Sequence, residues 1–89
     1  MSYTVKLTDK AKKQLSKMDK YKAKLISSWI FKNLVGCENP RAHGKGLTSN
    51  RSGQWRYRVG DYRILAEISE GELLILLVDI AHRSVVYDN

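Results

Sequence analysis

A tight turn at Gly60-Asp61 sets the layout of the second half of the chain. Residues 54–59 and 62–68 on either side alternate between apolar and polar side chains. A two-residue Gly-Asp connection between such segments is typical of a β-hairpin. The turn also fixes the register, because Val59 must then pair with Tyr62 and Arg58 with Arg63.

The predicted hairpin has one apolar face and one basic face. The apolar face, which should receive the helices, carries Trp55, Tyr57, Val59, Tyr62, Ile64, Ala66 and Ile68. The basic face carries Gln54, Arg56, Arg58, Arg63, Leu65 and Glu67. Like charges directly opposed on a sheet cost a few tenths to ~1 kcal/mol, and an anion bridging Arg58 and Arg63 would remove that cost. A solvated, purely structural basic face is the alternative.

The last strand is expected to bring a third arginine to the basic face. A second turn at Glu70-Gly71 leads into residues 73–80, which are apolar on both faces and predict a central strand. We expect the basic face to gain an apolar floor from Leu74, Leu76, Val78 and Ile80. Ile80 should lie beside Asp61, so that Arg83 meets Arg58 and Arg63 at one corner of the sheet. Arg83 could instead cap Glu67 or Asp79.

The first half of the chain predicts one strand and two helices. Residues 3–7 favour a strand, and Thr8 is a plausible N-cap for a helix that ends near residue 18. A second helix is expected from about residue 19 to 35, ended by Gly36, and residues 37–52 read as a long loop. Residues 84–87 could add a short strand. These elements predict a single α+β domain over residues 1–89, ordered β-α-α-β-β-β(-β), with a helix hairpin packed on one face of a mostly antiparallel sheet.

The charge balance indicates a polyanionic partner. Sixteen Lys and Arg against nine Asp and Glu give a net charge of +7 on 89 residues. Such a charge suits nucleic acid, an anionic membrane or an acidic protein. We expect a cytoplasmic protein without a membrane partner, because there is a single Cys, no visible signal peptide and no apolar run long enough to span a bilayer. The sequence has no metal-binding or nucleotide-binding motif, which predicts neither a metal nor a cofactor.

Three residues outside the hairpin are further candidates for a site. His82 adjoins the arginine corner and has a side chain suited to acid–base chemistry. His43, in the loop, could contact a backbone phosphate. Tyr87 could fold back toward the corner, although a terminal tyrosine is often only half-buried packing.

Residues 53–65, Gly-Gln-Trp-Arg-Tyr-Arg-Val-Gly-Asp-Tyr-Arg-Ile-Leu, resemble the signature of the RelE/ParE superfamily of bacterial toxins. The loop at residues 40–47 and the residues His82-Arg83 and Val86-Tyr87 resemble other parts of the family pattern. RelE-like members are endoribonucleases that cut mRNA in the ribosomal A site. The resemblance therefore implies three partners: a cognate antitoxin, the ribosome and mRNA.

The resemblance also implies roles for individual residues. Arg63 matches the arginine that contacts the scissile phosphate, and Arg83 matches the one that protonates or stabilises the leaving group. Tyr87 matches the tyrosine that helps to activate the attacking hydroxyl. Well-studied members have Lys where this chain has Arg56 and Arg58, and Arg gives up a proton far less readily. The expected catalytic residues are Arg58, Arg63, Arg83 and Tyr87, and the expected RNA-binding residues are Arg51, Arg56, Lys45, His82 and His43.

Metal-free RNA cleavage suits this residue set. The 2′-hydroxyl attacks the adjacent phosphate, which requires a proton acceptor and cations around the developing negative charge. Two other functions stay open at this point. One is a ParE-like poison of DNA gyrase without enzymatic activity, although typical ParE members lack the terminal Tyr. The other is a nucleic-acid-binding protein that associates with an antitoxin and carries out no chemistry.

Overall fold

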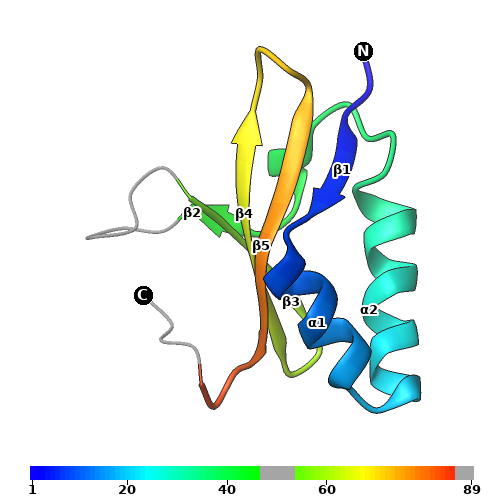
Figure 1. The fold of residues 1–89 in the computed structure, drawn as a ribbon. Coiled ribbons are helices and arrows are strands. Elements are labelled where there is room, and N and C mark those ends of the chain that lie inside the picture. Colours follow the sequence, from blue (N-terminus) through cyan, green and yellow to red (C-terminus); the bar gives the residue numbers. More distant parts are fainter. Residues whose placement is uncertain (47–53, 86–89) are drawn as a thin grey trace.

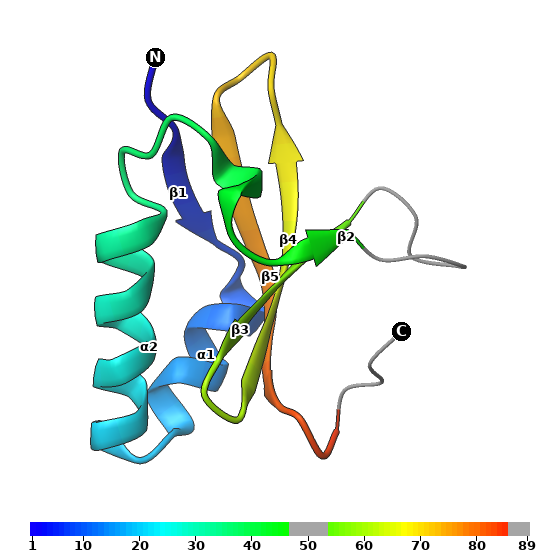
Figure 2. The same cartoon turned by 180° about the vertical axis from the view of Figure 1, so that it is seen from behind.

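Two helices cover one face of a twisted sheet in the computed structural model, which describes residues 1–46 and 54–85 (Figures 1 and 2). The strands are β1 (Thr4–Leu7), β2 (Lys45–Gly46), β3 (Trp55–Val59), β4 (Tyr62–Ser69) and β5 (Leu74–His82). Their order in the sheet is β1-β5-β4-β3-β2, with β1 parallel to β5 and every other neighbour antiparallel. The predicted α+β architecture, with a helix hairpin on a mostly antiparallel sheet, is confirmed.

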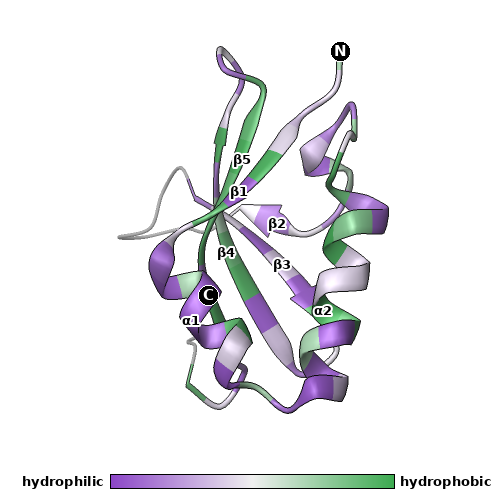
Figure 3. Cartoon of the chain, turned by 45° about the vertical axis from the view of Figure 1, so that its right-hand side comes forward, coloured by the Kyte–Doolittle hydropathy of each residue, from purple (hydrophilic) through white to green (hydrophobic). Residues whose placement is uncertain are grey.

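The helices α1 (Asp9–Lys17) and α2 (Lys20–Asn33) begin at side-chain caps. The Thr8 hydroxyl oxygen accepts a hydrogen bond from the Ala11 N–H at 3.1 Å, as predicted. Asp19 caps α2 by accepting from the N–H groups of Tyr21 and Lys22. Figure 3 shows that α1 is mostly hydrophilic, whereas β5 is mostly hydrophobic. No helix in the described part of the chain is long and apolar enough to cross a membrane.

The hairpin of β3 and β4 has the predicted register at all five pairs, from Trp55 with Ala66 to Val59 with Tyr62. Gly60 takes the left-handed φ of 57° that such a tight turn requires. The fully buried side chains of Tyr57, Ile64 and Ala66 form part of the core under the helices. The opposite face of the hairpin is therefore the basic face that the sequence predicts.

The predicted register of β5 is wrong. The turn before it spans four residues, 70–73, rather than two, and Leu73 takes a φ of 51° there. A β-bulge then places Leu65 opposite Asp79 and Ala66 opposite Leu77, so that the alternation of faces reverses after Val78. As a result Ile80 lies opposite Ile64 in the core, rather than beside Asp61 on the basic face.

The predicted loop at residues 37–52 contains regular structure that the sequence reading missed. A 3₁₀ helix spans Pro40–Ala42, and β2 pairs with the outer edge of β3. The predicted terminal strand begins as a turn instead, in which the Val85 N–H donates to the His82 carbonyl at 2.9 Å. The end of that prediction, at residues 86 and 87, lies outside the described residues.

Candidate functional site

The basic face carries a groove lined by cationic side chains. Lys45 of β2 lies directly across from Arg56 of β3, and Arg58 follows two residues further along β3. Together with Gly44 these three side chains line an open groove of about 300 Å³. The next strand places Arg63 directly across from Arg58. The sheet thus assembles four predicted site residues from three strands.

The arginines of this face differ in exposure. Arg56 and Arg63 are only 2% and 5% exposed, so a freely solvated surface does not describe them. The Arg63 guanidinium donates to the carbonyls of Gly60 and Tyr62 at 3.3 and 3.2 Å, which ties it to the hairpin turn. Arg58 is exposed. Two arginines are therefore held in place by their surroundings, while the third faces solvent.

Arg83 lies beside the hairpin turn. Its backbone N–H donates to the Asp61 carbonyl at 2.7 Å, and its Nε atom is 3.7 Å from Asp61 Oδ1. Its carboxylate neighbour is thus Asp61, and not Glu67 or Asp79 as the structural alternative proposed. Both side chains are more than half exposed, and exposed ion pairs of this kind contribute little stability. A bound phosphate could therefore displace Asp61.

The two histidines do not join the groove. The His82 ring packs edge-on against Tyr62 at 5.4 Å, and its Nδ1 atom accepts from the Ser84 N–H. The His43 ring packs edge-on against Trp29 of α2, on the helix side of the sheet. Neither histidine is among the described residues that line the groove. The remaining two candidates, Arg51 and Tyr87, lie outside the described residues.

Gly44 is a feature of the site that the sequence reading missed. Its φ of 78° lies in the left-handed region, and a Cβ atom there would collide with the Arg56 carbonyl oxygen. Only glycine lets β2 approach β3 this closely. The Gly44 position therefore sets where Lys45 stands against the arginines.

Tyr57 anchors the loop that leads into β2. Its hydroxyl donates to the Pro40 carbonyl at 2.6 Å, and the Trp55 indole N–H donates to the His43 carbonyl at 2.6 Å. Burial raises the pKa of the Tyr57 hydroxyl well above its usual value. Tyr57 therefore holds the loop in position and is a poor candidate for proton transfer.

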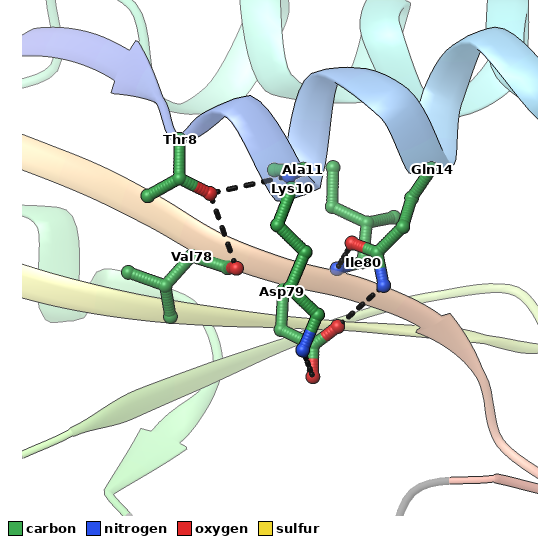
Figure 4. Close-up of polar contacts among 7 residues, drawn as sticks. All are labelled: Thr8, Lys10, Ala11, Gln14, Val78, Asp79 and Ile80. Atoms are coloured by element: carbon green, nitrogen blue, oxygen red, sulfur yellow. Dashed lines mark hydrogen bonds and ion pairs between the residues drawn. The ribbon is translucent and has the colours of Figure 1, made fainter.

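A polar network joins α1 to the edge of β5 (Figure 4). Gln14 accepts from the Ile80 N–H at 2.7 Å and donates to Asp79 at 2.6 Å, while the Lys10 ammonium lies 3.7 Å from Asp79. β1 pairs with β5 only as far as Leu77, and beyond it the Gln14 side chain provides the hydrogen-bond acceptor for the Ile80 N–H of β5. The network also compensates the carboxylate of Asp79, whose strand position is opposite Leu65 and next to the basic face.

The arrangement can hold a phosphate group, since cationic side chains from β2, β3 and β4 converge on one surface. A metal site is not built into residues 1–46 and 54–85, where no three His, Cys, Asp or Glu side chains come together.

Comparison with known proteins gives a consistent assignment. Residues 5–87 match the family described as the ParE toxin of the type II toxin–antitoxin system parDE. The toxin RelE of Mycobacterium tuberculosis is 31% identical over 85 residues, which cover 96% of this chain and 86% of that protein. The toxin RelG of the same organism is 28% identical over 87 residues, covering 98% of both chains.

The fold agrees with these sequence matches. In the crystal structure of the RelBE2 toxin–antitoxin complex from M. tuberculosis, a chain with 26% identity superimposes with a TM-score of 0.84, covering 93% of this chain and 100% of that one. Residues 55–59 and 62–65 of the hairpin signature stand on β3 and β4, as the sequence predicts. This chain belongs to the RelE/ParE superfamily of toxins from type II toxin–antitoxin systems.

Proposed function

We propose that this toxin inhibits translation by cutting mRNA on the ribosome, in the manner of RelE-like endoribonucleases. The observation that carries the proposal is the convergence of Lys45, Arg56 and Arg58 on one groove, with Arg63 opposite Arg58. RNA cleavage without a metal needs several fixed cations around one phosphate. The groove offers them on strands of a sheet, which hold side chains more precisely than loops do.

The proposed roles are those that the family resemblance implies, and they suit the chemistry of each side chain. Arg58, exposed at the groove, and Arg63, held at the turn, stabilise the charge that develops on the phosphate oxygens. Arg83 stabilises the leaving group once a phosphate displaces Asp61. Tyr87 activates the attacking hydroxyl. Arg51 and Arg56 contribute to RNA binding.

The proposed reaction balances without an external reactant. The 2′-oxygen bonds to the adjacent phosphorus, its proton passes to a base, and the bond from phosphorus to the 5′-oxygen breaks. The 5′-oxygen takes up a proton, so the products carry a free 5′-hydroxyl and a 2′,3′-cyclic phosphate, and a later hydrolysis by water converts the cyclic phosphate to a 3′-phosphate. A tyrosine has a reference pKa of ~10, so near neutral pH very little of it is in the phenolate form that can accept the proton. Activity on free RNA should therefore be low, with the ribosome supplying the bent geometry of the mRNA.

Poisoning of DNA gyrase is the second candidate function. The family description that matches residues 5–87 is that of ParE toxins, which favours this alternative. The named relatives RelE and RelG favour the nuclease instead. Binding without chemistry would need only the net charge of +7.

The proposed partners are a cognate antitoxin, mRNA and the ribosomal A site, all in the cytoplasm. A related toxin from M. tuberculosis is seen in a toxin–antitoxin complex. An acidic or amphipathic helix of the antitoxin would complement the basic and apolar surfaces of this chain.

Brief induction followed by mapping of mRNA 5′ ends tests the proposal. Clustered cuts within translated codons are expected. Gyrase-dependent DNA breaks with intact mRNA would establish the gyrase alternative. If induction causes no growth arrest, the result favours a protein that binds its partners and carries out no chemistry.

A further inference from the structure

One side chain of the groove differs in chemistry from its neighbours. Arg56 and Arg58 carry guanidinium groups, whereas Lys45 carries the one amine among the described residues that line the groove. An ammonium group gives up a proton more readily than a guanidinium by about two or more powers of ten. The groove thus combines two cations that only hold charge with one that can also transfer a proton.

The position of Lys45 is set by the backbone. β2 pairs Lys45 with Arg56, and the close approach at Gly44 presses β2 against β3. The Lys45 side chain is exposed, and none of the ion pairs recorded among the described residues involves it. Its ammonium is therefore available to a ligand in the groove.

Three other proton-carrying side chains near the sheet are engaged away from the groove. His82 packs on Tyr62 and contacts Ser84, and the His43 ring packs on Trp29. The Tyr57 hydroxyl is bound to the Pro40 carbonyl. In the described part of the chain, Lys45 is thus the residue of the groove suited to proton transfer.

The geometry points to Lys45 as the general acid of the cleavage reaction, an assignment that rests on the nuclease function proposed above. As the 2′-oxygen bonds to phosphorus, the bond to the 5′-oxygen breaks and its electron pair moves onto that oxygen. The Lys45 ammonium donates a proton there, which yields the 5′-hydroxyl and a neutral amine. The amine then regains a proton from water.

The test compares two substrates in single-turnover cleavage on ribosomes programmed with mRNA. One is ordinary RNA, and the other has sulfur in place of the bridging 5′-oxygen at the cut site. A thiolate leaves without a proton, so it needs no general acid. Lys45→Arg keeps the charge but not the readily transferred proton, and should slow cleavage of ordinary RNA roughly 10²-fold. The same variant should cut the sulfur substrate at close to the wild-type rate.

Two controls make the result specific. Lys45→Met removes both charge and proton and should remain slow on the sulfur substrate, because the electrostatic contribution is also lost. Lys12→Arg changes an exposed lysine on α1, away from the groove, and should match the wild type on both substrates.

The outcomes separate the two proposals. If the wild type cleaves mRNA and Lys45→Arg cleaves ordinary RNA equally fast, the general-acid assignment is overturned and the nuclease proposal stands. A defect in Lys45→Arg that is equally large on the sulfur substrate also overturns it, because the lost function is then not proton donation. A wild-type protein that cuts neither substrate overturns the nuclease proposal, and the Lys45 assignment falls with it.

Discussion

Arg58 and Arg63 lie directly across from each other on β3 and β4, although both side chains are positively charged. Cross-strand pairs of like charge destabilise a sheet. The hydrogen bonds of Arg63 to the Gly60 and Tyr62 carbonyls explain an arginine at position 63, but they do not explain a second one at position 58. This cost is consistent with the proposal that the two arginines hold an anionic ligand.

Arg58→Gln should stabilise the free protein and weaken its activity. Relief of the repulsion should raise the free energy of unfolding by a few tenths to ~1 kcal/mol, measured by urea denaturation at low salt. Cleavage on the ribosome should fall. Lys12→Gln is a suitable control, since it removes one exposed charge from α1 and leaves the pair intact. If Arg58→Gln is less stable than this control, the charges of the pair do not oppose folding.

Arg63→Ala should lower mRNA cleavage by roughly 10²–10³, as the loss of one electrostatic stabiliser does in other enzymes. Because Arg63 also donates to the carbonyls of Gly60 and Tyr62, circular dichroism must first establish that the variant is folded. Normal cleavage by a folded Arg63→Ala protein would remove Arg63 from the site.

Tyr87→Phe should keep ribosome binding and slow the chemical step, since only the hydroxyl is removed. Co-sedimentation with ribosomes measures binding, and single-turnover cleavage measures the step. An unchanged cleavage rate would rule out the proposed role of Tyr87 in activating the 2′-hydroxyl.

The sequence predicted those parts of the site that depend on local pattern. Gly60-Asp61 leaves one register for β3 and β4, and this placed Arg58 opposite Arg63 correctly. The path of β5 depends instead on packing. The bulge lets the Ile80 side chain reach the core, and the Asp79 carboxylate then contacts Gln14 and Lys10 of α1. An apolar run such as residues 73–80 carries no alternation from which a bulge could be read.

The failure of the sequence to predict strand β2 has a similar explanation. A strand of two residues is too short to show any periodicity, so the sequence predicts a loop at Lys45 although Lys45 belongs to the sheet. The one local sign of this strand was Gly44. A glycine is needed at this position because any side chain would collide with β3, and not because residue 44 lies among other residues that favour turns.

Tyr57 should make the protein sensitive to alkali. The folded protein raises the pKa of its hydroxyl, so folding favours the neutral form. That contribution to stability is fully present below the pKa of the unfolded tyrosine, ~10, and is lost as the pH rises above it. Urea denaturation of the wild type between pH 8 and 11 should show the loss. Tyr57→Phe should start less stable, because the Pro40 carbonyl loses its donor, and should show a shallower decline. Parallel declines in the two proteins would contradict this reasoning.

Gly44→Ala and Gly36→Ala form a matched pair that tests whether the approach of β2 builds the site. Both glycines have similar left-handed φ values, 78° and 76°, so alanine costs a comparable amount of backbone energy at each, roughly 1 kcal/mol. A Cβ at Gly36 meets open space, whereas one at Gly44 collides with the Arg56 carbonyl. Gly44→Ala should therefore lose more stability than Gly36→Ala, and it alone should reduce cleavage, because Lys45 moves away from Arg56. Equal effects of the two substitutions on stability and cleavage would show that the Gly44 contact does not position the groove.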